Sequence, residues 1–408
     1  MTRLPGTRCL LVLAFLFGMS PRTTSAGVVN SILLQWRAQA EKCEDSDRVD
    51  DITMVHVAMF EAVNSIARKY TPYKAMIPAA PGSSEVAAAA AAAHGVMVSV
   101  CPDMKSAYDG ALKKSLALVK DSVSRENGAA VGRKAAEAVL AARANANSKG
   151  RDPFFAASKP GVYVPTMRQV GMVFSKETPW VMTKPDELRP PAPPALGSAA
   201  WVRDYNEIKK LGARKSAART DEQTAIAKFW ANKDVRIVLP QLVGLPGRSL
   251  VDDARFLALA DMAWEDSYVA MMDGKYAHNY WRLVTAIRGA ATDGSDSTVA
   301  DPDWEPMANT PPHPEYPCGH CLSAGAVGTV IAREFGKDMP AMVIEQDSTL
   351  LLRYLNAQEY IDEVSESRIL FGVHYRNSAD VGKAMGVSIG KLAVERYFKP
   401  LKSSSSRK

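Results

Sequence analysis

The sequence has little of what several classes of protein require. It contains only five cysteines in 408 residues, 8% aromatic residues, and a formal net charge of only +6. It has no long basic run and no face that interleaves basic and aromatic residues, as nucleic-acid binders do. Strand patterns are nearly absent as well. These absences argue against a nucleic-acid partner and indicate a mainly α-helical globular protein.

Apolar runs long enough to span a membrane are also missing. Residues 9–19 form an apolar run behind Arg3 and Arg8, and the small residues 24–26 resemble a cleavage site, which is the pattern of a signal peptide. The run is shorter than the ~20 residues that a spanning helix needs. We therefore predict that residues 1–26 are removed and that the mature protein is periplasmic or secreted, with no membrane span. The cysteines that remain, which permit three pairings, are Cys43, Cys101, Cys318 and Cys321.

Helical periodicity recurs along the rest of the chain. It is interrupted by a proline-rich stretch that ends in RPPAPPAL, which we interpret as an ordered connection. The predicted organisation is an N-terminal helical bundle (27–147), this connection (148–197), a C-terminal helical bundle (198–400) and a disordered tail (401–408). The predicted helices cover residues 47–70, 86–100, 103–121, 126–145, 199–211, 220–230, 250–272, 276–288, 321–335, 349–364 and 379–397.

The stretch TPPHPEYPCGHC, residues 310–321, stands between two groups of basic residues. Lys275 and Arg282 precede it, seven residues apart, which would place them on one face of a helix. Arg368 and His374 follow it, six residues apart. A helix that begins near Cys321 would direct backbone N–H groups towards an anion. The pattern predicts one anion site built from three segments.

These blocks resemble the signature motifs of the superfamily that joins type 2 phosphatidic acid phosphatases, bacterial acid phosphatases and vanadium-dependent haloperoxidases. The family patterns are Lys-x6-Arg-Pro, Pro-Ser-Gly-His and Ser-Arg-x5-His. Here they correspond to 275–282, 317–320 and 367–374. The likeness is greatest to the soluble, exported haloperoxidase-like branch, and it implies an all-α fold of two packed helical bundles.

The resemblance also implies roles for individual residues. Lys275, Arg282 and Arg368 would hold the oxygens of vanadate or phosphate, with help from the Gly319 amide and from the residue at position 318. His374 would bind vanadium or attack phosphorus, and His320 would be the acid-base group. One imidazole must stay free to bond while the other transfers a proton.

Two reactions are consistent with this site. A haloperoxidase would use vanadate, hydrogen peroxide and a halide. A phosphatase would hydrolyse a small phosphoester through a phosphohistidine, without a cofactor. His313 lies seven residues before His320, where bromoperoxidases of the family have a second histidine, so we favour a haloperoxidase that oxidises bromide. The alternative is that His313 only caps a proline-rich turn. A homodimer is left open.

Some residues depart from the family pattern. Cys318 replaces a serine whose hydroxyl would bind the oxyanion, and a thiol is a weaker donor. Leu283 replaces a proline. Ser378 stands where an acid often follows the last histidine, so Asp380 or a backbone carbonyl is expected to orient His374. Glu265 and Asp266 are candidate partners of the site arginines, unless they lie on a solvated helix face.

The cysteines suggest further alternatives. Cys-Gly-His-Cys also occurs in thiol-disulfide oxidoreductases, but neither flank has a strand pattern. Hypohalous acid would oxidise a free thiol, so we predict that Cys318 and Cys321 form a disulfide, or else that the enzyme is a phosphatase. A catalytically silent anion-binding protein would follow if the departures at Cys318 and Ser378 disable the site.

Overall fold

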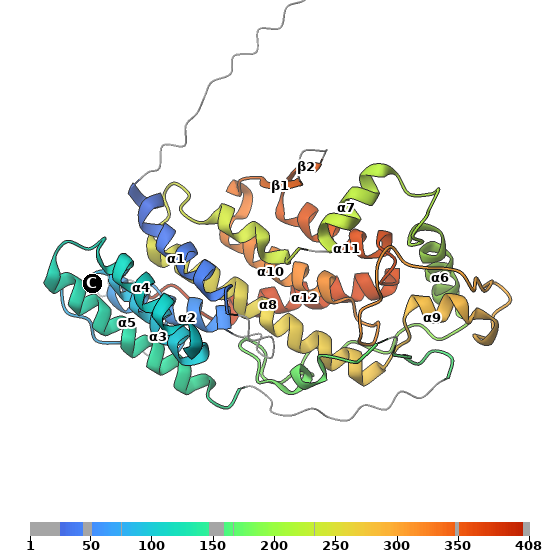
Figure 1. The fold of residues 1–408 in the computed structure, drawn as a ribbon, viewed down its shortest axis with the longest axis horizontal. Coiled ribbons are helices and arrows are strands. Elements are labelled where there is room, and N and C mark those ends of the chain that lie inside the picture. Colours follow the sequence, from blue (N-terminus) through green and yellow to red (C-terminus); the bar gives the residue numbers. More distant parts are fainter. Residues whose placement is uncertain are drawn as a thin grey trace, which may run out of the picture.

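The computed structural model of the protein describes residues 25–43, 51–74, 76–146, 159–165, 167–231, 233–346 and 351–402. Over these residues the fold is helical, and the only strands are two short ones that form an antiparallel hairpin (Figure 1). The prediction of an all-α fold is confirmed. The predictions of a signal peptide and of a disordered tail fall largely on residues 1–24 and 403–408, outside the described residues.

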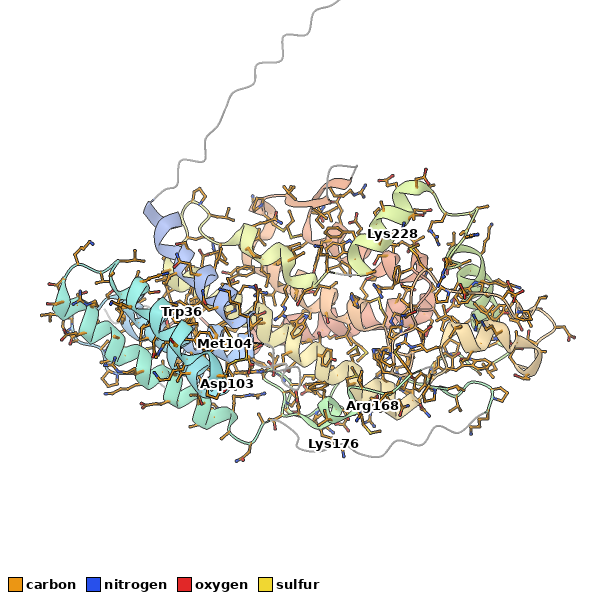
Figure 2. All side chains as sticks on the ribbon, viewed as in Figure 1. Trp36, Asp103, Met104, Arg168, Lys176 and Lys228 are labelled. Atoms are coloured by element: carbon orange, nitrogen blue, oxygen red, sulfur yellow. A yellow bond between two sulfur atoms is a disulfide. The ribbon has the colours of Figure 1, made fainter. Side chains whose placement is uncertain are left out.

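The first helices pack on one another as an N-terminal bundle, coloured blue to cyan in Figure 1. α3 packs against both α2 and α5, and its inner side consists of buried alanines. α1, which the sequence analysis did not predict, carries the buried side chain of Trp36 into the bundle (Figure 2). The bounds are α1 (Ser25–Ala40), α2 (Asp51–Ala67), α3 (Glu85–Val100), η1 (Pro102–Met104), α4 (Lys105–Leu116) and α5 (Ser122–Arg143).

The C-terminal bundle is built around α8, α10 and α12. α10 packs against α8, α11 and α12, and α7 lies on the outer side of α11. Its elements are α6 (Ala199–Leu211), α7 (Asp221–Ala231), η3 (Val235–Leu242), α8 (Leu250–His278), α9 (Leu283–Arg288), η4 (Ala290–Thr292), α10 (Gly319–Phe335), η5 (Gly336–Asp338), β1 (Met342–Gln346), β2 (Leu351–Leu355), α11 (Ala357–Leu370) and α12 (Arg376–Arg396), and η2 (Met172–Lys176) precedes them.

The predicted helix over residues 349–364 is wrong in its first part. Leu351–Leu355 is strand β2, paired with Met342–Gln346. α11 begins only after Asn356, whose side chain accepts the amide of Glu359 at 3.0 Å while Glu359 accepts the amide of Asn356 at 2.9 Å. This reciprocal capping box satisfies donors that a helix start leaves free, so it determines where α11 begins.

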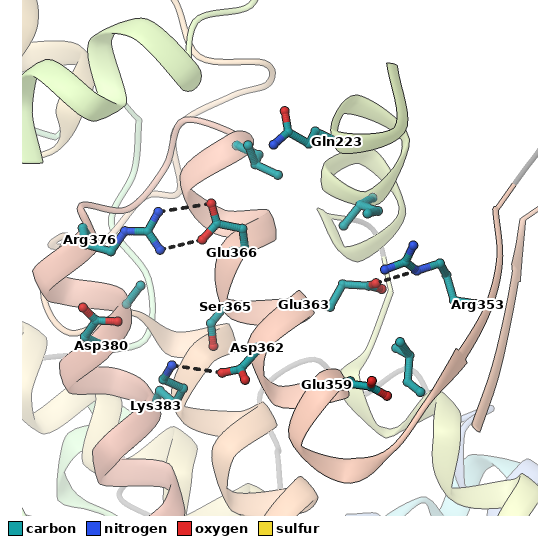
Figure 3. A pocket seen from close by; sticks show the side chains of 14 residues that line it. Gln223, Arg353, Glu359, Asp362, Glu363, Ser365, Glu366, Arg376, Asp380 and Lys383 are labelled. Atoms are coloured by element: carbon teal, nitrogen blue, oxygen red, sulfur yellow. Dashed lines mark hydrogen bonds and ion pairs between the residues drawn. The ribbon is translucent and has the colours of Figure 1, made fainter. Parts of the chain in front are cut away.

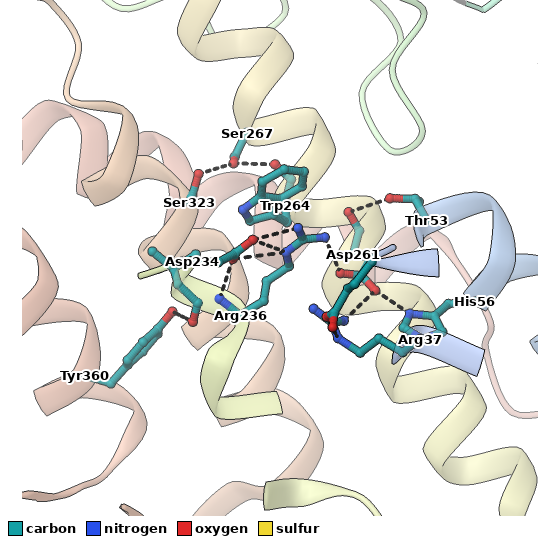
Figure 4. A network of polar contacts seen from close by, with 12 residues as sticks. Arg37, Thr53, His56, Asp234, Arg236, Asp261, Trp264, Ser267, Ser323 and Tyr360 are labelled. Carbon is teal, nitrogen blue, oxygen red and sulfur yellow. Dashed lines mark hydrogen bonds and ion pairs between the residues drawn. The ribbon is translucent and has the colours of Figure 1, made fainter. Parts of the chain in front are cut away.

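The 29-residue helix α8 connects the two bundles, since it contacts α1 and α2 on one side and α10 and α12 on the other. At its middle, the fully buried carboxylate of Asp261 accepts hydrogen bonds from Arg37 of α1 at 3.5 Å and from Arg236 of η3 at 3.0 Å (Figure 4). His56 of α2 contacts the same carboxylate through Nδ1. The guanidinium of Arg236 stacks on Trp264, 3.6 Å from the ring centre. This cluster couples four elements inside the protein.

The proline-rich connection is described over residues 159–165 and 167–197. Its backbone pairs with the chain after α8: the Tyr163 amide donates to Asn279 O at 2.9 Å. Further along, Val170 N donates to Pro312 O at 3.2 Å, and Tyr316 Oη donates to Pro191 O at 2.9 Å. The connection therefore lies against the 310–317 stretch. The predicted domain boundaries stay predictions.

None of the helices in the described part of the chain combines the length and the apolar character needed to cross a membrane.

Close packing of α10 against α12 depends on glycine. A Cβ atom at Gly386 would lie 2.0 Å from Leu322 O and 2.8 Å from Ala326 N, both backbone atoms of α10. We expect Gly386→Ala to lower the free energy of unfolding by about 1–3 kcal/mol, because α10 must move away. The control is Gly110→Ala in α4, where a Cβ would meet nothing within 4 Å; it should raise stability by about 0.5–1 kcal/mol. Urea unfolding of both variants measures the difference, and equal stabilities would contradict the prediction.

Candidate functional site

Lys275 and Arg282 do not share a helix, contrary to the sequence prediction. α8 ends at His278 because Asn279 adopts the left-handed conformation, with φ 50°. Asparagine tolerates this conformation and often ends helices. Arg282 is the N-cap residue of α9 and Leu283 is its first helical residue. Proline is favoured at that position, which accounts for the proline of the family pattern.

The ammonium group of Lys275 is fully buried and donates to three backbone carbonyls. These belong to Pro314 at 3.0 Å, Glu315 at 2.7 Å and Pro317 at 2.7 Å. Burial, together with the charges of Arg282 and Arg368, lowers the pKa of Lys275 well below its ordinary value. Lys275 thus fixes the 313–317 loop to the end of α8, and an anion bound beside it would favour its charged form.

Arg282 joins the loop to the segment before α12. Its Nε donates to His313 O at 2.8 Å, one terminal nitrogen donates to His313 Nδ1 at 2.9 Å, and the other donates to Val373 O at 3.0 Å. Burial lowers the pKa of Arg282 to about 10, although Glu315 opposes the shift. Burial also lowers the pKa of His313 well below its ordinary value, and Lys275 and Arg282 add to this effect. His313 therefore faces the site as a neutral ring.

Cys318 and Cys321 form a disulfide at the start of α10, with Cα atoms 5.4 Å apart. Cys318 is the N-cap residue, and its Sγ accepts the Cys321 amide at 3.3 Å. A disulfide sulfur has no hydrogen to donate, so Cys318 does not replace the family serine as an oxyanion donor. α10 begins at Gly319, two residues earlier than predicted. The second disulfide joins Cys43 and Cys101.

The first amides of α10 remain available to an anion. No hydrogen bond among the described residues uses the N–H of Gly319 or His320, as expected at a helix start. A Cβ at position 319 would lie 2.1 Å from Met271 Sδ, so any larger residue there would force the Met271 side chain to move. α10 and the irregular loop before it flank the Cys-Gly-His-Cys sequence, so the strand and helix arrangement of a thioredoxin-like oxidoreductase is missing here.

Arg368 and His374 lie on either side of the turn between α11 and α12. Arg368 is in the last turn of α11, and one terminal nitrogen donates to Trp230 O at 3.4 Å. Its buried Nε has no partner among the described residues. Burial, with a contribution from Arg282, lowers the pKa of Arg368 to about 9. His374 is 3% exposed and stands just before Tyr375, the N-cap residue of α12.

The orienting partner of His374 is Glu315, which the sequence analysis missed. Glu315 Oε1 lies 2.7 Å from His374 Nδ1 and accepts the Tyr375 amide at 3.2 Å. The expectation of Asp380 or a backbone carbonyl was wrong, and Asp380 is exposed. Burial raises the pKa of Glu315 to about 7, against the effect of Lys275 and Arg282. The available signal was an acid within a proline-rich stretch next to the Gly-His block.

The remaining acidic candidates lie elsewhere. Glu265 pairs with Arg143 at 3.3 Å, and Asp266 accepts the amides of Trp180, Val181 and Met182. Both side chains are buried, so neither the proposed pairing with the site arginines nor the solvated face is correct.

A surface groove of about 770 Å³ lies between α7, α11, α12 and β2. Ion pairs hold its walls, including Arg376 with Glu366 and Arg353 with Glu363 (Figure 3). Glu363 also accepts Trp230 Nε1 at 3.0 Å, and the carbonyl of Trp230 accepts Arg368. The groove contains none of the residues that the motifs predict.

The cluster as a whole carries excess positive charge. Lys275, Arg282 and Arg368 form no salt bridge with any residue that the structure describes, and all three are buried. Buried unpaired charge is costly, so an anion at this position would stabilise the cluster. With the Arg368 Nε, the two helix amides and the free His374 Nε2, the residues fit a tetrahedral oxyanion such as vanadate or phosphate.

Comparisons with known proteins identify similar sequences and folds. Residues 255–403 match the family described as the second helical-bundle domain of vanadium chloroperoxidase (VCPO). Vanadium chloroperoxidase from Curvularia inaequalis is 26% identical over 185 residues, 35% of this chain and 29% of that protein. The match thus spans less than a third of that relative.

Two solved structures have the same fold. A bacterial vanadium-dependent iodoperoxidase aligns with a TM-score of 0.68 at 20% identity, covering 92% of this chain and 96% of the other. A holo-type bacterial vanadium-dependent chloroperoxidase aligns with a TM-score of 0.67 at 18% identity, covering 93% and 94%. These likenesses show that the chain shares the helical-bundle fold of these structures, and that residues 255–403 are similar to the second domain of vanadium chloroperoxidase.

Proposed function

We propose that the protein is a vanadate-dependent haloperoxidase that oxidises a halide, with bromide preferred, using hydrogen peroxide. The observation that carries the proposal is the set of buried, unpaired cations around His374, whose Nδ1 is engaged by Glu315. This contact leaves Nε2 with its lone pair directed away from Glu315 and able to bind a vanadium centre. Bound vanadate would supply a Lewis-acidic centre that activates peroxide for oxygen transfer to halide.

The protein's own groups divide the remaining work. Lys275, Arg282 and Arg368 compensate the charge of the oxyanion, and the amides of Gly319 and His320 donate to its oxygens. Burial, with the charges of Arg368 and Lys275, lowers the pKa of His320 to about 3. His320 is thus neutral near pH 7 and able to accept a proton from incoming peroxide.

The disulfide supports the peroxidase over the phosphatase. A free thiol beside the site would be consumed by hypohalous acid, whereas the Cys318 and Cys321 sulfurs are already joined. His313 supports bromide, since Arg282 donates to its Nδ1 at 2.9 Å; the same atom also lies 3.2 Å from Pro314 O in the proline-rich turn. Export is part of the proposal as well, because disulfides persist in oxidising compartments.

Paired assays test the proposal. Bromination by peroxide that appears only when orthovanadate is added is the expected result. Phosphomonoester hydrolysis in the absence of vanadate, inhibited when vanadate is added, would instead establish the phosphatase. The absence of both activities, with orthovanadate still bound, would identify a silent anion-binding protein.

A further inference from the structure

The contact between Glu315 and the start of α12 completes a helix cap from a distant part of the chain. In a capping box, the third helical residue supplies a carboxylate that accepts the amide of the N-cap residue. The N-cap residue of α12 is Tyr375, and the third helical residue is Ser378, whose side chain is too short. Glu315 accepts the Tyr375 amide instead, through the same Oε1 that faces His374 Nδ1.

The other side of this contact has polar atoms that no protein group pairs. Glu315 Oε2, Tyr375 Oη and Ser378 Oγ are buried, and none of them forms a hydrogen bond of 3.5 Å or less among the described residues, although the Ser378 hydroxyl is near enough to lower the pKa of Glu315. The three residues are at most 3% exposed. Each unpaired buried polar group costs about 1–3 kcal/mol, so three in one place indicate a missing common partner.

The same three residues line one small cavity. Its volume is about 10 Å³, and Trp201, Asp204 and Tyr280 are among the residues that close it. A cavity of roughly 10–15 Å³ accommodates one water molecule, and buried waters typically make two to four hydrogen bonds. Two hydroxyls and a carboxylate oxygen supply both acceptors and donors for a single water.

We propose that this cavity is a one-water site and that Glu315, held by the water, is the positioning residue of His374. The water donates to Glu315 Oε2 and bonds the hydroxyls of Ser378 and Tyr375. The carboxylate then cannot rotate, so Oε1 keeps both the imidazole N–H of His374 and the Tyr375 amide. The inference deepens the proposed function, because His374 belongs to the proposed site, yet the water and the orientation of the ring exist without turnover.

The geometry also indicates a second position, residue 378, from which a carboxylate could orient His374. Ser378 projects from the third residue of α12 into the cavity. An aspartate there would displace the water, accept the Tyr375 amide as an ordinary capping box does, and approach His374 once the side chain of Glu315 is shortened. The positioning role should therefore be transferable from residue 315 to residue 378.

The test combines structure, spectroscopy and binding. A high-resolution crystal structure of the full protein should show one ordered water bonded to Glu315, Tyr375 and Ser378. In ¹⁵N NMR, His374 should carry its proton on Nδ1. Glu315→Ala should lose this tautomer and bind orthovanadate about 10–100-fold more weakly, as for the loss of a group that orients a metal ligand. Glu315→Ala/Ser378→Asp should recover the tautomer and most of the affinity.

Several outcomes would overturn the inference. They are a cavity without ordered water, a Glu315→Ala variant with wild-type tautomer and affinity, or a folded double variant that recovers neither. If Glu315→Ala does not fold, Glu315→Gln replaces it, since the amide preserves volume; retention of wild-type orthovanadate affinity in that variant would also contradict the inference. Loss of bromination with the water and the tautomer intact would count against the proposed function alone.

Discussion

Replacing His374 with alanine is expected to reduce vanadate-dependent bromination roughly 10³-fold or more, the scale seen when a group bonded to the reacting centre is removed. The variant loses Nε2, the one atom proposed to bond to vanadium. Glu315 and the three cations remain, so weak electrostatic binding of orthovanadate should persist. Steady-state kinetics together with calorimetric titration of orthovanadate measure both quantities.

The matched control is His278→Ala. His278 is in the last turn of α8, and its ring contacts Pro190 O at 3.0 Å and forms no hydrogen bond with His374 or Glu315 among the described residues. This half-buried histidine is outside the proposed vanadium-binding set, so the variant should keep the bromination rate within about twofold. If His374→Ala retains the activity of the His278→Ala control, the assignment of His374 is wrong whichever reaction the protein catalyses.

The largest loss of stability is expected from Asp261→Asn. The Asp261 carboxylate forms hydrogen bonds with Arg37, His56 and Arg236. This cluster joins α1, α2 and η3 to α8. Removing its charge leaves two buried guanidinium groups with less compensation, and breaking a buried pair costs about 3–5 kcal/mol. The control is Asp362→Asn, which breaks an exposed pair with Lys383 at 3.0 Å and should cost less than about 1 kcal/mol. Urea unfolding measures the free energy of unfolding of both variants. Equal decreases in the two would contradict the prediction.

The same cluster predicts a pH dependence. Burial raises the pKa of Asp261, but Arg37, His56 and Arg236 outweigh it and hold this pKa below its ordinary value. Burial lowers the pKa of His56, against the effect of Asp261. In both cases the unfolded chain binds protons at a higher pH than the folded protein, so stability falls as pH falls. The decline should begin near pH 6.5, where an unfolded histidine titrates, and continue below pH 4. In the Asp261→Asn variant, the loss of stability below pH 4 should be smaller than in the wild-type protein.

Local patterns were sufficient for much of the fold. Alanine-rich and amphipathic periodicity identified most helices, because burial of one face depends on spacing along the chain. The prediction of α6 over 199–211 agrees with the structure in both bounds. The errors occurred where a single residue sets a helix boundary. Asn279 ends α8, and the capping box at Asn356 places the start of α11 after the hairpin.

The sequence by itself determined the helical class, the three basic segments and the two histidines, because the spacing within each block is local. Only the tertiary structure decided how those residues are used. Glu315 lies 59 residues before His374, and the two meet because Lys275 fixes the loop and Arg282 ties it to the segment before α12. The disulfide between Cys318 and Cys321 agrees with the prediction from the sequence, but the role of Cys318 as the N-cap residue of α10 depends on geometry that spacing does not contain.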